Sequence, residues 1–324
     1  MVKSLEAIKA PIAAELKAFE KHFREAMRSP VPLLDRITYY IVRRKGKQVR
    51  PMFVFLSAKL CGDTNAATFN AASFIELLHT GTLVHDDVVD DSNERRGFFS
   101  VNALWKNKIA VLVGDYFFSK GMLLALKHKH YRLLEIFSEA IQAMSEGELL
   151  QIEKARRLDI DESVYYDIIR QKTASLIASA CAAGAASTTQ DEALIQRMHQ
   201  FGEKIGLAFQ IRDDLFDFGM DDVGKPLGID IKEKKMTLPL IYALQNASKN
   251  DRRRILYTIK KYNEKPEKVK EVIDFVRASG GLEYTEKVMH DFRAQAFELL
   301  YEFPLSPSRQ ALEELIIFVT DRKK

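Results

Sequence analysis

Apolar residues recur along most of the chain at intervals of three and four positions, the spacing of one face of an α-helix. Few segments alternate apolar and polar residues with the period of two that is typical of a β-strand. The pattern predicts helices over residues 5–27, 35–42, 52–60, 70–90, 102–127, 133–151, 197–218 and 238–245, a long helix opening at residue 161, and several shorter helices over residues 252–320. Because no linker divides these segments, we expect one all-α domain spanning residues 1–324.

The predicted helix over residues 70–90 ends in a dense acidic group. Asp86 and Asp90 lie one helical turn apart on one face, and Asp87 starts a second such row. Like charges at this spacing destabilise a helix unless a cation lies between them. Carboxylate and water oxygens suit Mg²⁺, so the group predicts a magnesium site. The adjacent Arg95 and Arg96 could then bind the remaining oxygens of a polyphosphate.

The same acidic spacing occurs again after a later apolar run. Asp213, Asp214 and Asp217 repeat it, and Gln210 precedes them on the same helix face. One such group is ordinarily a solvated helix end. Two groups on two buried helices are better explained by helices that face each other across a cavity.

Basic residues in three further segments are candidates for binding phosphate. Lys47 and Arg50 precede a predicted helix N-terminus, where free N–H groups favour an anion. Lys172 lies just before a run of Ala, Ser and Gly over residues 174–187, which predicts a tightly packed central helix. Residues 220–235 combine Gly, Pro and Lys and are expected to form a lid over phosphate. A solvated surface is the alternative for each segment.

The helix that leads to Asp86 carries further candidates. His79 lies two turns earlier on the same side, about 10 Å away, and is either a second anion ligand or a core histidine. Leu78 and Thr82 continue the Asp86 row toward the N-terminus. Because Gly81 and Thr82 are small, we expect a gap in the cavity wall below the carboxylates, unless a neighbouring side chain fills it.

Composition excludes several classes of protein. The net charge of +4 over 324 residues is close to balanced and does not indicate nucleic-acid binding. The two cysteines, Cys61 and Cys181, lack metal-ligand spacing and favour reduced thiols in a cytoplasmic protein. No stretch approaches the length of uncharged apolar sequence that spans a membrane, so we expect no transmembrane segment.

Taken together, these residues resemble the motifs of the trans-isoprenyl diphosphate synthases, or polyprenyl synthetases. The motifs occur in the family's order: Gly46-Lys47 with Arg50-Pro51, His79, Asp86-Asp87 with Asp90, Arg95-Arg96, Lys172-Thr173, Phe209-Gln210, Asp213-Asp214 with Asp217, and Gly224-Lys225 with Lys235. The resemblance implies a helical bundle around a deep cavity, a homodimer, and three Mg²⁺ ions with bound diphosphate. It also implies head-to-tail joining of an allylic diphosphate to isopentenyl diphosphate.

The resemblance assigns a role to each motif residue. The metal ligands would be Asp86, Asp90 and Asp213, supported by Asp87, Asp214 and Asp217. The allylic diphosphate would be held by Arg95, Lys172, Lys225 and Lys235, with Gln210 and Thr173 nearby. Isopentenyl diphosphate would be held by Lys47, Arg50, His79 and Arg96. The catalytic set would be Asp86, Asp90, Lys172, Asp213 and Lys225.

Product length is expected to depend on the helix below Asp86. Short-chain members of this family block the tunnel with bulky residues four or five positions before the first aspartate. Here those positions hold Thr82 and Gly81, with Leu78 one turn further, so we expect a product of about C35–C40, as in a quinone side-chain precursor. Met122, Leu126 and Phe137 are candidates for the tunnel floor.

Four alternatives remain at this point. A farnesyl or geranylgeranyl diphosphate synthase would share every motif. A terpene cyclase or head-to-head synthase would lack the basic 46–51 segment. A catalytically silent partner subunit is disfavoured by the intact aspartates and lysines. A helical interaction protein with chance acidic patches would not explain the ordered basic motifs.

Overall fold

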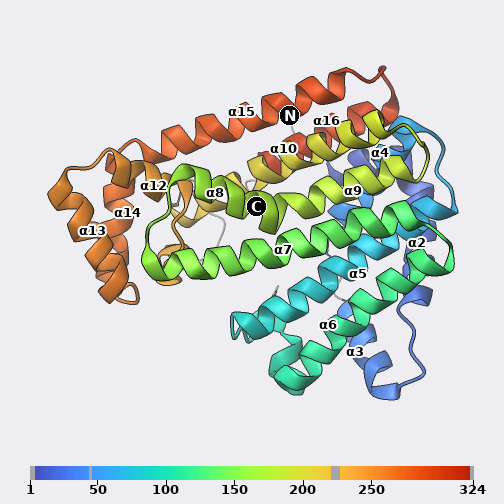
Figure 1. Ribbon diagram of the computed structural model, residues 1–324, viewed down its shortest axis with the longest axis horizontal. Helices are drawn as coiled ribbons and strands as arrows, with labels where there is room; N and C mark the ends of the chain where they lie inside the picture. Colours follow the sequence, from blue (N-terminus) through green and yellow to red (C-terminus); the bar gives the residue numbers. More distant parts are fainter. Residues whose placement is uncertain (1–3, 44–45, 96, 220–226, 322–324) are drawn as a thin grey trace.

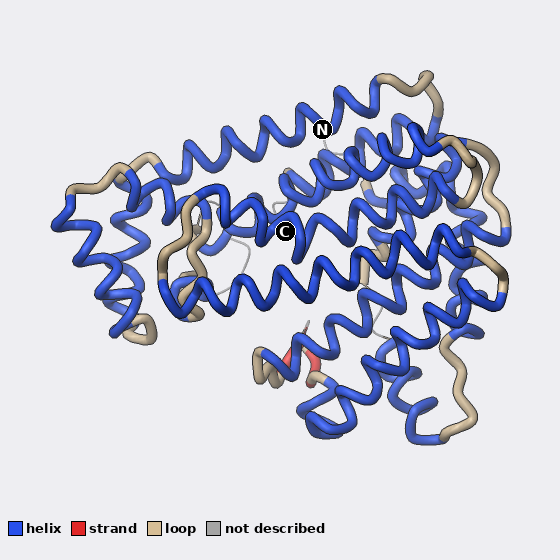
Figure 2. Tube along the Cα trace, viewed as in Figure 1, coloured by secondary structure: helices blue, strands red, loops and turns tan. Residues whose placement is uncertain are grey.

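The computed structural model describes residues 4–43, 46–95, 97–219 and 227–321 and is almost entirely helical (Figures 1 and 2). The predicted all-α class is confirmed. Within the described residues, the β-structure consists of two short antiparallel strands, β1 (Glu94–Arg95) and β2 (Phe98–Phe99), with Glu94 opposite Phe99. That the whole chain is one domain stays a prediction.

The helices follow one another with short connections. In chain order they are α1 Leu5–Lys9, the 3₁₀ turn η1 Ala10–Ile12, α2 Ala13–Ala26, α3 Pro32–Val42, α4 Val49–Cys61, α5 Ala66–Val89, α6 Val101–Lys127, α7 Tyr131–Arg157, α8 Glu162–Ile169, the π-helical turn η2 Arg170–Ala174, α9 Ser175–Ala186, α10 Glu192–Asp217, α11 Ile229–Lys232, α12 Leu238–Gln245, α13 Lys249–Tyr262, α14 Pro266–Ala278, α15 Gly281–Tyr301 and α16 Pro307–Thr320.

Helix boundaries differ from the predicted ones where local chemistry intervenes. The first predicted helix, 5–27, is broken by the turn η1, which contains Pro11, because proline lacks the N–H that would continue the helix. Helix α5 starts four residues earlier than predicted. Asn65 and Thr68 form a capping box there, in which each side chain accepts a hydrogen bond from the other residue's backbone N–H.

Helix α9 lies at the centre of the bundle, between α4 and α10. A Cβ added at Gly184 would lie 2.4 Å from the carbonyl oxygen of Val54 on α4. A Cβ added at Gly206 of α10 would lie 2.4 Å from the Cα of Ala174. The small residues therefore let the backbones approach closely, as the composition of residues 174–187 predicts. This packing fixes α10 and the η2 turn relative to each other.

Helix α6 packs against α5 on one side and exposes an apolar surface on the other. Gly114 and Gly121 permit the close contact, since a Cβ at either position would overlap His85 or Phe74 of α5. Among the described residues, α6 is the one helix long and apolar enough to cross a membrane, which differs from the expectation drawn from uncharged stretches. A core or interface helix of a soluble protein passes the same criterion, so length and composition do not indicate a membrane span.

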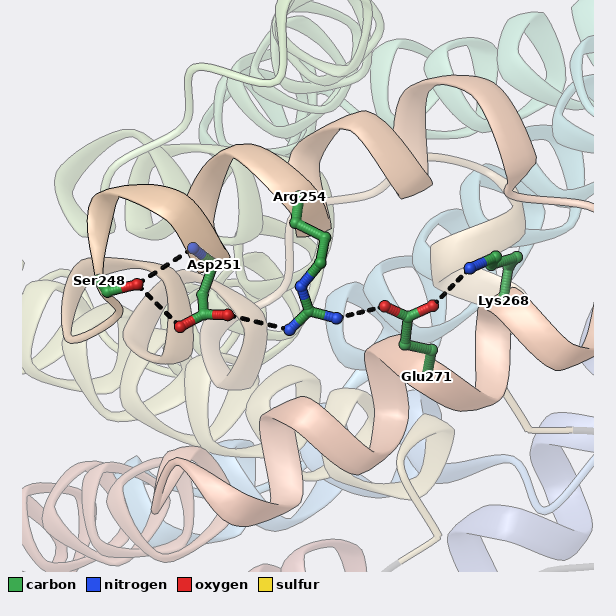
Figure 3. Close-up of polar contacts among 5 residues, drawn as sticks. All are labelled: Ser248, Asp251, Arg254, Lys268 and Glu271. Atoms are coloured by element: carbon green, nitrogen blue, oxygen red, sulfur yellow. Dashed lines mark hydrogen bonds and ion pairs between the residues drawn. The ribbon is translucent and has the colours of Figure 1, made fainter.

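Helices α12, α13 and α14 form one end of the molecule, and α13 and α14 project from it (Figure 1). A chain of polar contacts joins these two helices (Figure 3). Asp251 accepts a bond from Arg254 at 3.0 Å, Arg254 also pairs with Glu271, and Lys268 donates to Glu271 at 2.8 Å. These groups are largely solvent-exposed, so the contacts orient the two helices more than they stabilise them.

Candidate active site

A cavity of about 940 Å³ lies between the C-terminal ends of α5 and α10. Its wall contains Asp86, Asp87 and Asp90 from α5 and Asp213 and Asp214 from α10. Asp213 and Asp90 are exposed, whereas Asp87 and Asp214 are buried. The two acidic rows, which are more than 120 positions apart in the chain, therefore line the same space.

The loop before α4, the first turn of α4 and the middle of α5 add basic groups to the same wall. Lys47, Arg50 and His79 all line the cavity, and His79 is buried. Gln48 has a left-handed backbone, with φ of 54°, at the position before α4 begins. The ammonium group of Lys47 lies 5.1 Å from the ring centre of Phe318 on α16, so the C-terminal helix also borders this side of the cavity.

The Lys172 segment lies in a π-helical turn, η2, between α8 and α9. π-helical turns are rare in proteins, but those that occur are often found at functional sites. The turn packs directly on Gly147 of α7, where an added Cβ would lie 2.9 Å from the backbone nitrogen of Lys172. The Lys172 side chain lines the cavity and pairs with Glu148, the residue after this glycine. The ion pair joins the η2 turn to α7.

A hydrogen-bond network links the η2 turn to the second acidic row. Thr173 donates to the side-chain oxygen of Gln210 at 2.9 Å, and the Gln210 amide donates to Asp214 at 2.8 Å. The other oxygen of Asp214 accepts a bond from Tyr165 of α8 at 2.6 Å. Burial raises the pKa of the Asp214 carboxyl well above its ordinary value, and the charge of Asp230 adds to this effect.

Asp214 therefore holds neighbouring side chains in place, because each of its oxygens accepts a hydrogen bond within the protein. The sequence predicted Asp214 as a supporting metal ligand and did not predict these hydrogen bonds. Tyr165 has no signal in the sequence, since its contact with Asp214 spans 49 positions and two helices.

Asp217 also makes bonds within the protein. Its carboxylate accepts the backbone N–H groups of Ile229 at 2.7 Å and Asp230 at 3.2 Å, at the start of α11. The Asp217 carbonyl accepts the N–H of Gly228 at 3.0 Å. Unlike the other predicted aspartate ligands, Asp217 is not among the described residues that line the cavity. Its contacts join the end of α10 to α11.

Asp230 and Lys235 occupy the wall between the two acidic rows. Burial raises the pKa of Asp230 to about 7, and the charge of Asp217 adds to the effect. Burial disfavours the charged form of Lys235, but its hydrogen bond with Glu233 and the nearby charges of Glu233 and Asp230 act against this, and the pKa of Lys235 is raised. The charge of Asp90, on the opposite row, raises it further. Lys235 is thus a firmly protonated group within electrostatic reach of both rows. Asp230 was not among the predicted site residues.

Some predicted site residues cannot be placed. Arg96 and Lys225 lie outside the described residues, as do residues 220–226 of the predicted lid over residues 220–235. Arg95 is described through its backbone, which pairs with Phe98 in the short hairpin. Their predicted contacts with diphosphate stay predictions.

The predicted chain-length residues do not line this cavity, although all three are described. Leu78 is fully buried in the core, and the Thr82 hydroxyl donates to the His79 carbonyl of its own helix at 2.8 Å. A Cβ added at Gly81 would lie 2.9 Å from the ring of Phe118 on α6. The expected gap below Asp86 is thus filled by Phe118, because Gly81 faces the neighbouring helix. The position of Gly81 in the sequence does not reveal that Phe118 of α6 packs against it.

The candidate floor residues also lie away from the cavity wall. Phe137 is fully buried, with its ring centre 4.5 Å from that of Phe74. Leu126 is 45% exposed on the outer face of α6. Met122 is partly buried and packs against the main core. These contacts do not assign a tunnel floor.

The donor set fits magnesium. No group of three or more His, Cys, Asp or Glu side chains that could hold a metal ion occurs among the described residues. Mg²⁺ is ordinarily held by one or two carboxylates together with water and substrate phosphate, so a preformed cage of protein ligands is not required. Exposed carboxylates on two sides of one cavity match that requirement.

Apolar side chains form a large part of the rest of the cavity wall. They include Phe23, Phe53, Leu83, Val84, Ile168, Ile169, Ile177 and Phe209. A cavity lined by both charged and apolar side chains suits a ligand with a charged head and a hydrocarbon tail.

The comparisons with known proteins agree with this geometry. Residues 31–276 match the polyprenyl synthetase family. An all-trans-nonaprenyl-diphosphate synthase (geranyl-diphosphate specific) from Rhodobacter capsulatus is 37% identical over 97% of both chains. A short chain isoprenyl diphosphate synthase from Methanothermobacter thermautotrophicus is 35% identical over 94% of this chain and 95% of that protein. The crystal structure of a decaprenyl diphosphate synthase from Rhodobacter capsulatus superposes with a TM-score of 0.92 at 32% identity, covering 99% of this chain and 100% of that one.

The all-α fold and the cavity are those of a trans-prenyltransferase. The chain belongs to the polyprenyl synthetase family.

Proposed function

We propose that the protein catalyses the Mg²⁺-dependent head-to-tail condensation of isopentenyl diphosphate with an allylic prenyl diphosphate, giving a long-chain all-trans polyprenyl diphosphate. One observation carries the proposal: two acidic rows, the basic loop before α4 and Lys235 all line one cavity with an apolar wall. A diphosphate needs the charged rim, and a prenyl chain needs the apolar wall.

Asp86, Asp90 and Asp213 would hold magnesium, with Asp87 beside them. Three bound ions are expected from the family resemblance. Bound Mg²⁺ neutralises the charge that develops on a leaving diphosphate. Asp214 and Asp217 would support this site, and their hydrogen bonds to Tyr165, Gln210 and the start of α11 favour a positioning role for both.

The reaction can be followed through the chain's own groups. Lys172 and Lys235 stabilise the allylic diphosphate as its C–O bond breaks. The apolar wall keeps water from the carbocation that remains. Lys47, Arg50 and His79 hold isopentenyl diphosphate so that its alkene attacks from a fixed position and forms the new C–C bond. A proton then leaves the adjacent carbon, and the released diphosphate accepts it.

Purified protein with MgCl₂, farnesyl diphosphate and labelled isopentenyl diphosphate tests the reaction. We expect a ladder of linear prenyl diphosphates that ends near C35–C40, about seven or eight isoprene units. A cyclic hydrocarbon product would support a terpene cyclase. Absence of turnover would contradict the proposal and support a silent subunit or an interaction protein.

We also propose that the protein is a cytoplasmic homodimer. Beyond the break in helical geometry at Lys106, α6 carries exposed apolar side chains: Val111, Leu112, Leu123 and Leu126. Apolar surface of this extent on a soluble protein ordinarily marks an interface, and a second copy of the same helix would cover it with matching chemistry. Both cysteines are free thiols, which suits a reducing compartment.

A further inference from the structure

The hydroxyl group of Thr237 is buried without a hydrogen-bond partner in the part of the chain that the structure describes. Thr237 is 6% exposed, and it lines the cavity. Nearly all buried polar groups in proteins are bonded, and leaving one unpaired costs stability. An unpaired hydroxyl at a cavity wall is explained if a ligand of the cavity completes its bonding.

The backbone around Thr237 is already fixed, so the hydroxyl is not needed to build the fold. Thr237 is the N-cap residue of α12, and its carbonyl accepts the N–H of Ile241 at 3.0 Å. Its side chain makes no capping bond. Ser248, at the same position of α13, does cap its helix by accepting the N–H of Asp251 at 3.1 Å. The Thr237 side chain is therefore available for a partner in the cavity.

The surroundings favour an anion as that partner. Lys235, two positions earlier, lines the same cavity as a protonated amine. Thr237 lies at the positive end of the α12 dipole, where the first turn has the backbone N–H groups of Leu238 and Leu240, Pro239 having none. A hydroxyl donor, an ammonium group and a helix N-terminus together match the oxygens of a phosphate group.

We propose that Thr237 donates its hydroxyl hydrogen to an oxygen of the diphosphate that Lys235 binds, so that the start of α12 forms part of the allylic diphosphate site. This inference deepens the proposed function and rests on it for the identity of the substrate. Position 237 reads as an ordinary helix cap in the sequence, and only its burial and unsatisfied hydroxyl group in the folded chain indicate a ligand.

Inorganic pyrophosphate with Mg²⁺ is the direct probe. Isothermal titration calorimetry of Thr237→Val, which keeps the shape and removes the hydroxyl, should give a Kd at least about tenfold weaker than wild type, as expected for a lost bond to a charged group. Thr237→Ser keeps the hydroxyl and should restore most of the affinity. Unchanged affinity in Thr237→Val would overturn the inference.

Thermal unfolding without ligand provides a second measurement. Because the hydroxyl has no partner in the unliganded protein, Thr237→Val should unfold at the same temperature as wild type or higher. Thr285→Val is the matched control: Thr285 is fully buried on α15 and its hydroxyl donates to the Gly281 carbonyl at 2.7 Å. That variant should lose stability and keep its pyrophosphate affinity. A Tm loss in Thr237→Val equal to that of Thr285→Val would show that the hydroxyl has a partner within the protein, and would overturn the inference.

Steady-state kinetics separate this inference from the proposed function. In Thr237→Val, KM for the allylic diphosphate should rise, and KM for isopentenyl diphosphate should stay near the wild-type value. A rise for isopentenyl diphosphate alone would overturn the assignment to the allylic site. If wild-type protein binds pyrophosphate through Thr237 but forms no prenyl product, the proposed reaction fails while the phosphate contact stands.

Discussion

At the residue scale, adjacent aspartates of the second acidic row have different environments. Asp213 is exposed at the cavity, whereas Asp214 is buried and bonded to Tyr165 and Gln210. A helix places neighbouring residues about 100° apart, so one carboxylate can meet a metal ion while the next faces the bundle. The motif therefore contains one exposed carboxylate and one buried carboxylate that is hydrogen-bonded within the protein.

Removing the Tyr165 hydroxyl tests the positioning role. In Tyr165→Phe, one oxygen of Asp214 stays buried and loses its partner, which should lower the free energy of unfolding by about 1–3 kcal/mol. The Asp214 carboxylate, which accepts the hydrogen bond of Gln210, is then held less firmly, and Gln210 is less well positioned. We therefore expect kcat to fall, while the Mg²⁺ concentration for half-maximal activity stays unchanged. Urea denaturation and metal titration measure the two effects.

Tyr166→Phe is the matched control for this prediction. Tyr166 lies on the same helix and contacts Phe292 and the Glu162–Tyr284 pair, away from Asp214. The kcat of the Tyr166→Phe variant should remain near the wild-type value. A shifted Mg²⁺ requirement in Tyr165→Phe would instead favour Asp214 as a metal ligand.

Asp230 predicts a pH dependence in the metal-free protein. Its pKa rises from an ordinary 3.8 to about 7 on folding, mainly because of burial. The folded state then binds more protons than the unfolded state between these values, so the contribution of Asp230 to stability is present at low pH and is lost as pH rises toward 7. Urea denaturation in EDTA from pH 4 to pH 7 measures the slope. Asp230→Asn should flatten it, and an unchanged slope would contradict the assignment.

At the element scale, contacts between helices decide where the charged groups lie. Gly147 lets α7 touch the π-helical turn that carries Lys172. Asp217 binds the start of α11, which lies a few residues before Lys235. Neither contact is visible within one helix, because each depends on a partner that is distant in the sequence.

The contact between α5 and α6 bears on product length. Phe118 of α6 fills the space beside Gly81, so a bulky residue at position 81 would displace α6. Thr82 is only partly buried and leaves more room for a larger side chain. If the family's chain-length position operates here, Thr82→Phe should shorten the product ladder. Chromatography of the products measures this, and an unchanged set of long products would remove position 82 as a determinant.

At the scale of the whole molecule, the exposed apolar face of α6 predicts self-association. Leu112 is 57% exposed near the middle of this face. Leu112→Lys should convert a dimer to monomers, because a charge buried at an apolar interface is costly. Light scattering after size-exclusion chromatography measures the mass. Leu305→Lys is the control, since Leu305 is 68% exposed between α15 and α16. A monomeric wild-type protein would contradict the dimer.

The predicted fold class and most predicted helices are confirmed, because helical periodicity is a local property. The predicted helix 238–245 agrees with α12, whereas 5–27 is broken at Pro11 and 70–90 begins earlier at a capping box. The acidic rows were located because their spacing is local. Tyr165, Asp230 and Thr237 were not predicted as site residues, because each depends on burial and on contacts between helices.

The sequence by itself determined that the chain is helical, that it carries two acidic rows and basic motifs, and to which family it belongs. These properties depend on the spacing of residues along the chain, which can be read without knowing which residues contact one another in the folded protein. Only the tertiary structure decided that the rows line one cavity, that Asp214 faces Tyr165, and that Phe118 fills the space beside Gly81. The physical reason is that these contacts join residues distant in sequence, and their geometry is set by how the helices pack.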